Sequence, residues 1–247
     1  MSKTAAESRG TETNAKAYYD DFAGWYERER GRGYHGLIDD LEVDIVMPYA
    51  RGKRVLELGC GTGLILGRIA PAAKQAEGID LSEGMIEKAR QRGLSVRVGS
   101  VTELPFEDAS FDLCYSFKVL AHVPDIGKAL AEAKRVTRPG GHMILEFYNP
   151  LSLRYLAKKV AGPQRISDGR TEADMYTRWD APHVIPRILP PGVRLVGYRG
   201  VRVVTPAAFV HKLPVVGKAF ELAERKACDS PLRYFGGFLV AILERTA

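Results

Sequence analysis

Short apolar runs alternate with amphipathic segments through the middle of the chain. Five runs have the length and composition of buried strands, at residues 55–58, 76–80, 95–101, 111–117 and 142–150. After the second run, Met85, Ile86 and Ala89 mark one apolar helical face, and residues 126–136 repeat this spacing after the fourth run. A strand and helix alternation of this length predicts an α/β fold with a doubly wound, mostly parallel sheet.

The last third of the chain continues the pattern with longer insertions. Strands are expected at residues 194–205 and 237–243, which brings the sheet to seven strands, and residues 162–191 are rich in loop-forming residues. Helices are expected at residues 151–160, 207–213 and 216–228. Insertions of this kind lie above the carboxyl ends of the strands, where open α/β sheets bind their ligands.

The first fifty residues divide into a tail and two helices. Residues 1–13 are rich in Ser, Thr, Glu and Gly, which predicts a disordered tail. From residue 14, aromatic side chains that include Tyr18 and Tyr26 fall on one helical stripe, and a second helix runs from Gly36 to just before Pro48.

Three glycines in five residues follow the first predicted strand, in the sequence Glu57-Leu58-Gly59-Cys60-Gly61-Thr62-Gly63. Glycine lets the backbone turn tightly and approach a ligand, and a helix that follows presents unpaired N–H groups. This pattern predicts a nucleotide-type site. A dinucleotide fingerprint would place glycine or alanine at position 64, where this chain has Leu64, so the spacing favours a different adenosine ligand.

The chain resembles the class I S-adenosylmethionine-dependent methyltransferases, in which the segment ELGCGTG is the cofactor loop. Further matches follow in the right order, as LPF…SFD at residues 104–112 and VLAHVPD…RVTRPGGHMILE at residues 119–146. The latter resembles the branch that includes the ubiquinone and menaquinone methyltransferases. The resemblance covers about residues 54–150 and implies a Rossmann-like methyltransferase fold that binds S-adenosyl-L-methionine and releases S-adenosyl-L-homocysteine.

Asp80 ends the second predicted strand, where an acid can accept two hydrogen bonds from a ribose diol. The alternative is that Asp80 and Ser82 only cap the next helix. The family usually has an Asp for the adenine amino group near the end of the third strand, but this chain has Gly99-Ser100 there. Ser100 can accept one hydrogen bond, or Val101 can supply its backbone amide.

The resemblance implies a set of cofactor-binding residues from the loop, the strand ends and the N-terminal segment. They are Tyr18, Tyr26, Glu57, Gly59, Cys60, Gly61, Gly63, Asp80, Leu81, Met85, Ser100, Val101, Phe117 and Lys118. For the tyrosines, ordinary packing of a helix onto the sheet is the alternative. We expect one domain over residues 14–247, with an N-terminal helical lid at 14–50, a cofactor-binding core at 54–150 and substrate-side insertions at 151–193 and 206–235.

Several side chains are candidates for chemistry beyond cofactor binding. His122 follows the fourth strand and is a candidate general base, with a structural hydrogen bond at the strand end as the alternative. Lys118 can meet an anionic acceptor or extend to solvent. His183 and His211 are further candidate bases. Cys60 stands where a helix start would lower a thiol pKa, but the resemblance assigns this position a backbone role.

Charge and cysteine content narrow the remaining possibilities. Residues 1–150 contain 20 Lys/Arg and 22 Asp/Glu, whereas residues 151–247 contain 16 and 8, so the net charge of +6 comes from the C-terminal part. That part is a candidate for an anionic substrate or for peripheral membrane contact, or is only a solvated face, and no nucleic-acid motif is present. Three cysteines without metal-binding spacing favour neither a disulfide framework nor a metal site. We expect a cytoplasmic protein, because no leader or spanning segment is recognised.

The leading hypothesis is a methyltransferase that acts on a small molecule, such as a quinone precursor, a lipid-like compound or a secondary metabolite. The alternatives are a non-catalytic S-adenosylmethionine-binding regulatory protein and a dinucleotide-dependent oxidoreductase. Leu64 and the LPF…PGG pattern count against the last alternative. The sequence does not fix whether oxygen, nitrogen or carbon is methylated, nor the oligomeric state.

Overall fold

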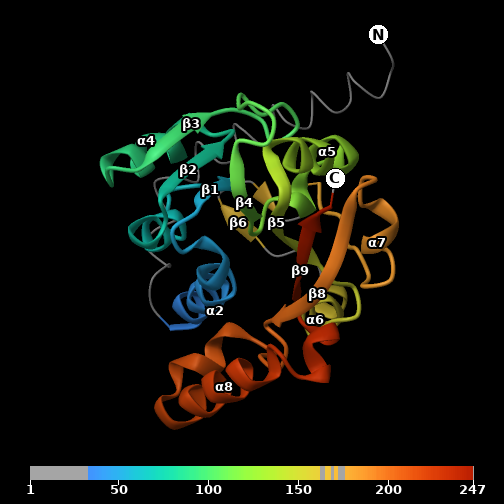
Figure 1. Ribbon diagram of the computed structural model, residues 1–247. Coiled ribbons are helices and arrows are strands. Elements are labelled where there is room, and N and C mark those ends of the chain that lie inside the picture. The colour runs from blue at the N-terminus through green and yellow to red at the C-terminus, as the bar shows by residue number, and fades with distance from the viewer. Residues whose placement is uncertain (1–32, 162–164, 168–169, 172–175, 247) are drawn as a thin grey trace.

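A seven-stranded sheet forms the centre of the protein in a computed structural model (Figure 1). The structure describes residues 33–161, 165–167, 170–171 and 176–246, so the predicted tail and the aromatic helix with Tyr18 and Tyr26 lie outside the described residues. The strand order is β3 (Ser95–Val98), β2 (Gln75–Asp80), β1 (Arg54–Leu58), β4 (Phe111–Ser116), β5 (Thr137–Tyr148), β9 (Phe238–Arg245) and β8 (Val193–Val201).

In this sheet β9 runs opposite to the other six strands. It pairs antiparallel with β5 and with β8, whereas β3, β2, β1, β4 and β5 pair parallel with one another. The order reverses direction at β1, from which the chain continues first outward to β3 and then back to β4. The predicted doubly wound, mostly parallel seven-stranded sheet is therefore confirmed, and the carboxyl ends of six strands meet at one edge.

Helices and short hairpins connect the strands. The longer helices are α2 (Gly33–Ala50), α4 (Glu83–Gln91), α5 (Ile126–Val136), α6 (Leu153–Ala161) and α8 (Pro214–Ala227). Shorter helices are α3 (Leu66–Ile69), η1 (Ala70–Ala72), η2 (Leu120–His122), α7 (Ile185–Ile188), η4 (Ala208–Lys212) and η5 (Pro231–Phe235), and β6 (Arg165–Ser167) pairs with β7 (Arg170–Thr171). Figure 1 shows α8 at the opposite end of the molecule from α5.

Alternating side chains of the central strands fill two cores. On β4, Leu113 and Tyr115 pack with Ile45 of α2 on one face of the sheet, and Cys114 packs with Leu130 of α5 on the other. This alternation follows from the two-residue period of a strand. Burial of both faces explains why the strands read as nearly continuous apolar runs in the sequence.

Several predicted boundaries are wrong, and the third and sixth predicted strands end early, at Val98 and Val201. The helix expected to end before Pro48 continues to Ala50, because Pro48 removes only one hydrogen-bond donor near the end of a helix whose apolar residues pack into the core. The fifth strand begins at Thr137 rather than at residue 142. Its register shifts where it pairs with β4, and Gly140 at φ +73° accommodates the irregularity, so the Pro-Gly-Gly segment distorts the strand without interrupting it.

Candidate active site

The glycine loop is tied to the end of β2 by backbone hydrogen bonds. The N–H groups of Gly59 and Cys60 both donate to the Ile79 carbonyl, at 2.7 and 2.9 Å. Gly59 has φ +73°, and a Cβ at this position would lie 2.2 Å from Cγ2 of Val119. Gly61 has φ +53° with no heavy atom within 4 Å of where its Cβ would lie. The loop therefore requires glycine for two reasons, close packing at Gly59 and an open cradle at Gly61.

Gly63 has a packing role in the loop. It has φ +79°, and a Cβ there would lie 2.3 Å from Cδ1 of Leu94 and 3.3 Å from Cβ of Ala89. It does not line either of the two pockets described below. The third glycine thus lets the loop and α3 approach α4 closely, and the prediction that Gly63 binds cofactor stays a prediction.

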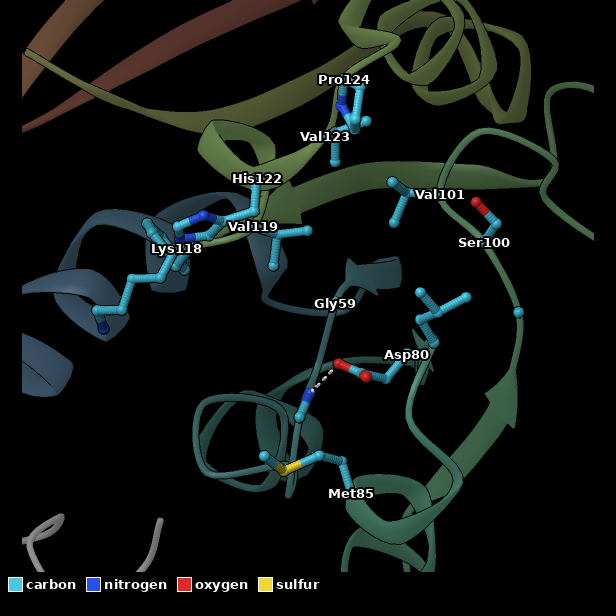
Figure 2. Close-up of a pocket in the computed structure, with 14 residues that line it drawn as sticks. Gly59, Asp80, Met85, Ser100, Val101, Lys118, Val119, His122, Val123 and Pro124 are labelled. Atoms are coloured by element: carbon cyan, nitrogen blue, oxygen red, sulfur yellow. Dashed lines mark hydrogen bonds between the residues drawn. The ribbon is translucent and has the colours of Figure 1, made fainter. Parts of the chain in front are cut away.

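Asp80 connects the loop to the start of α4. Its Oδ2 accepts a hydrogen bond from the Gly61 N–H at 2.8 Å, and its Oδ1 accepts one from the Ser82 N–H at 2.9 Å (Figure 2). The side chain that caps α4 is Ser82, whose Oγ accepts the Met85 N–H at 3.2 Å. A carboxylate offers about four acceptor positions in all. Asp80 can therefore hold the loop and still accept hydrogen bonds from a diol.

A pocket of about 840 Å³ opens between the loop and the chain after β4. The predicted residues that line it are Gly59, Gly61, Asp80, Leu81, Met85, Ser100, Val101, Phe117, Lys118 and His122. Figure 2 shows Met85 on one side of Asp80 and Val101 with Ser100 on the other. The Ser100 Oγ lies 2.8 Å from Oγ1 of Thr102 and accepts the Thr102 N–H at 3.2 Å, so it also holds its own turn.

A smaller space of about 340 Å³ shares Gly59, Gly61, Phe117 and Lys118 with this pocket. Among the predicted residues, Glu57 and Cys60 line it. Burial raises the pKa of the Glu57 carboxyl and of the Cys60 thiol. A thiol with a raised pKa is a poor nucleophile, which agrees with the backbone role implied for Cys60.

Lys118 is paired with acids inside the protein instead of extending to solvent, and its contact with a cofactor or an anionic acceptor stays a prediction. Its Nζ lies 2.6 Å from Oε1 of Glu42 and 3.4 Å from Oδ1 of Asp39, both on α2. Figure 2 shows this side chain directed away from Asp80. Its backbone has φ +62°, and its N–H donates to Oε1 of Glu146 at 2.9 Å. Lys118 therefore links α2 to the pocket wall. Its partners, Asp39 and Glu42, are too distant from it in the sequence to be recognised from the sequence alone.

His122 lines the pocket, and both nitrogens of its ring have polar neighbours. Its Nδ1 lies 2.9 Å from the Tyr176 carbonyl oxygen, and its Nε2 lies 3.5 Å from the Tyr148 hydroxyl. These contacts orient the ring, which fits the structural alternative and leaves a proton-transfer role a prediction. His183 and His211 do not line the pocket, and the ring of His211 lies beside Thr205, with Nε2 3.1 Å from Oγ1.

The sequence interpretation missed four residues that line the larger pocket, Gly99, Val119, Val123 and Pro124. Three of them, Val119, Val123 and Pro124, lie within three residues of His122 in the sequence. Their closeness to this predicted residue could have indicated that they line the same pocket. Gly99 precedes Ser100, and a Cβ there would lie 2.7 Å from Cδ1 of Ile79. Glu42, which lines the smaller space, carries no recognisable signal on its helix.

Comparison with known proteins decides what kind of domain holds this pocket. Residues 56–145 match a family model described as a methyltransferase domain. The chain is 36% identical over 121 residues to a malonyl-[acyl-carrier protein] O-methyltransferase of Serratia marcescens, covering 47% of this chain and 48% of the relative. Residues 56–145 are therefore similar to a methyltransferase domain. The recognition made from the glycine loop, with S-adenosylmethionine as the cofactor, is confirmed.

Two further comparisons agree with this assignment. A ubiquinone/menaquinone biosynthesis C-methyltransferase of Dinoroseobacter shibae is 39% identical over 129 residues, covering 47% of this chain and 50% of the relative. The fold is similar to that of an S-adenosylmethionine-dependent methyltransferase from Thermotoga maritima, with a TM-score of 0.65, 20% identity and coverage of 94% of this chain and 99% of that one. The chain spans about half the length of the two relatives matched by sequence.

The described part of the chain lacks two other kinds of feature. None of its helices has the length and apolar character needed to cross a bilayer. Within the same residues, no group of three or more His, Cys, Asp and Glu side chains is arranged to hold a metal ion.

Proposed function

We propose that this protein transfers a methyl group from S-adenosylmethionine to a small-molecule acceptor. The observation that supports the proposal is the joint arrangement of Gly61 and Asp80, an open cradle beside a carboxylate that already orders the loop. The ribose diol would lie on Asp80, and the adenine between Met85 and Val101. The methionyl end would lie over Gly59, toward the smaller space.

The bound sulfonium supplies an activated methyl group. The chain then has to hold the acceptor in line with that group and exclude water, and well-oriented reactants gain about 7–11 kcal/mol from positioning. A base is needed only where the acceptor must lose a proton. His122 is the residue we propose for this role, because it lines the pocket while Tyr176 and Tyr148 orient its ring.

Calorimetry with the full chain tests this proposal. We expect S-adenosylmethionine and S-adenosylhomocysteine to bind in the micromolar range and NAD not to bind. Methyl transfer is then followed in a broad acceptor screen with labelled S-adenosylmethionine. Binding without transfer would favour the non-catalytic alternative, and preferential binding of NAD would favour the oxidoreductase.

We also propose that the C-terminal part contacts an anionic membrane surface. On α6, Leu153, Leu156 and Val160 are exposed at a spacing of three and four residues, which places them on one face. On α8, Val215 and Leu222 are exposed in the same way. Both helices follow carboxyl ends of strands, so these exposed apolar faces lie on the same side of the sheet as the pocket.

The charge around these faces supports a lipid partner. Lys218 and Lys226 lie three residues after Val215 and four after Leu222, on the same face of α8, and α6 contains Lys158 and Lys159 and no acid. An exposed apolar stripe with lysines is the pattern of an interfacial helix.

Co-sedimentation with vesicles checks this contact. We expect the full chain to bind vesicles of anionic phosphatidylglycerol more tightly than vesicles of phosphatidylcholine, and L156E/L222E to abolish the difference. The control is V98E, which puts one negative charge on an exposed apolar residue of β3 and is compared with L156E and L222E as single variants. Equal binding to both vesicle types, or equal loss in the control, would contradict the contact.

A further inference from the structure

A buried arginine lies at the start of α6. Arg154 is only 8% exposed, and its Cζ lies 4.2 Å from the ring centroid of Tyr148, 4.6 Å from that of Phe238 and 5.2 Å from that of Trp179. Three aromatic rings from three different elements therefore surround one guanidinium. Aromatic faces attract a cation, but they do not neutralise its charge.

A second arginine lies beside it. Arg202 follows β8 at φ +57°, and its Cζ lies 5.3 Å from the ring centroid of Tyr34. A Cβ on Gly237 would lie 3.1 Å from Cβ and Cδ of Arg154 and 3.4 Å from Cδ of Arg202. The two arginine side chains thus flank the same glycine, and the absence of a side chain there leaves room for both.

Neither arginine has an acidic partner among the residues that the structure describes. No carboxylate there lies within ion-pair distance of Arg154 or Arg202, and the Arg154 Nη1 and the Arg202 Nε are buried without a hydrogen-bond acceptor. Burial lowers the pKa of the Arg202 guanidinium, and the nearby charge of Arg154 lowers it further. Buried charges in proteins are normally paired, because removing them from water is costly.

The two acids nearest to this pair are committed elsewhere. Glu224 on α8 accepts the N–H groups of Val203, Val204 and Thr205. Glu146 accepts the N–H of Lys118, and burial raises the pKa of its carboxyl to about 8, so it is largely protonated at neutral pH. The site therefore keeps an excess of positive charge.

The arginine pair is connected to the cofactor pocket through two side chains. Arg154 stacks on Tyr148, and the Tyr148 hydroxyl lies 3.5 Å from Nε2 of His122, which lines the pocket. Arg154 and Arg202 also follow β5 and β8, whose carboxyl ends lie at the pocket edge of the sheet. The pair therefore lies on the side from which an acceptor would approach His122.

We propose that the acceptor of this enzyme carries a carboxylate, which Arg154 and Arg202 bind together. Guanidinium groups bind carboxylates through paired, charge-assisted hydrogen bonds, and an acid held there would supply the missing negative charge. The aromatic rings around Arg154 favour an acceptor whose carboxylate is attached to an apolar or aromatic body. This inference rests on the proposed methyltransferase function, and it names the class of substrate.

The test uses the full chain saturated with S-adenosylhomocysteine, with benzoate as the probe and neutral benzamide as its uncharged counterpart. We expect benzoate to bind more tightly than benzamide by calorimetry. A hydrogen bond to a charged group contributes about 1.5–3 kcal/mol, so R202M and R154M should each weaken benzoate binding by about 10- to 100-fold. The matched control is R90M, at an exposed arginine of α4, which should bind benzoate as the parent chain does.

Further measurements separate the outcomes. R154K keeps a cation on the aromatic rings but loses the planar fork, so it should still bind benzoate less tightly, and it replaces R154M if that variant does not fold. Equal binding of benzoate and benzamide, or unchanged benzoate affinity in R202M, would show that the arginines only pack against aromatic rings. If S-adenosylhomocysteine itself fails to bind the parent chain, the proposed function fails instead.

Discussion

The cofactor side and the acceptor side of this protein treat buried charge in opposite ways. Around the glycine loop, the Asp80 carboxylate accepts two backbone N–H groups, and the ammonium of Lys118 is paired with Glu42. Around α6 and the end of β8, Arg154 and Arg202 have no acid within ion-pair distance among the described residues. The first arrangement is complete without a ligand, whereas the second is suited to an anionic one.

The two sides differ in which parts of the chain determine ligand specificity. The cofactor side is made from residues that are close in sequence, between β1 and η2, and its geometry depends on backbone atoms. The acceptor side is made from side chains of α2, α6, β8 and β9, which are far apart in the sequence. A backbone-defined site retains one ligand, while side chains can be exchanged to accept different partners.

Substitution of Gly59 should cause the largest loss of stability on the cofactor side. In G59A the new Cβ would approach Val119 to 2.2 Å at φ +73°, so we expect a loss of unfolding free energy of about 2–4 kcal/mol in urea denaturation. G61A is the matched control, because its Cβ meets no protein atom and only the left-handed backbone costs about 1 kcal/mol. Equal stability of the two variants would contradict the packing role of Gly59.

Removal of the Asp80 carboxylate should weaken the cofactor next most strongly. D80A loses the proposed ribose contacts and the bond that orders Gly61, so we expect S-adenosylhomocysteine to bind about 100-fold less tightly in calorimetry. The control is D108A, at an exposed aspartate that pairs with Arg135. An unchanged affinity in D80A would exclude Asp80 as a ligand, and the loop would then have to hold the cofactor by backbone groups alone.

The effect that is smallest per pH unit concerns Glu146, which lies between the two sides. Its raised pKa means that the folded protein holds a proton that the unfolded chain releases, so unfolding free energy falls as pH rises from about 4.3 to about 8. E146Q keeps an acceptor for the Lys118 N–H and removes this dependence. We expect its stability relative to the parent chain to rise over that window, by at most about 1.4 kcal/mol per pH unit.

Chemical denaturation at a series of pH values gives this difference. E103Q, which changes an exposed glutamate, should show no pH-dependent difference from the parent chain. A flat difference for E146Q as well would mean that Glu146 is ionised in the folded protein, and that the arginines then have a charged acid nearby.

The sequence predicted the cofactor side well for a physical reason. The turn at Gly59, the acid at Asp80 and the strand and helix periods are local features, and local features can be read from spacing. The partners of Lys118 could not be predicted, because Glu42 lies on a helix 76 residues earlier in the chain. The positions of Arg154 and Arg202 on either side of Gly237 could not be predicted either, because they depend on how β8 and β9 pair.

A crystal structure of the full chain with S-adenosylhomocysteine tests the central claim most directly. The account predicts that the ribose hydroxyls lie on the Asp80 carboxylate and that the sulfur faces a cavity bounded by His122, with Arg154 and Arg202 on its far side. Density for the ligand away from Asp80, or a sulfur turned away from the arginine pair, would contradict it.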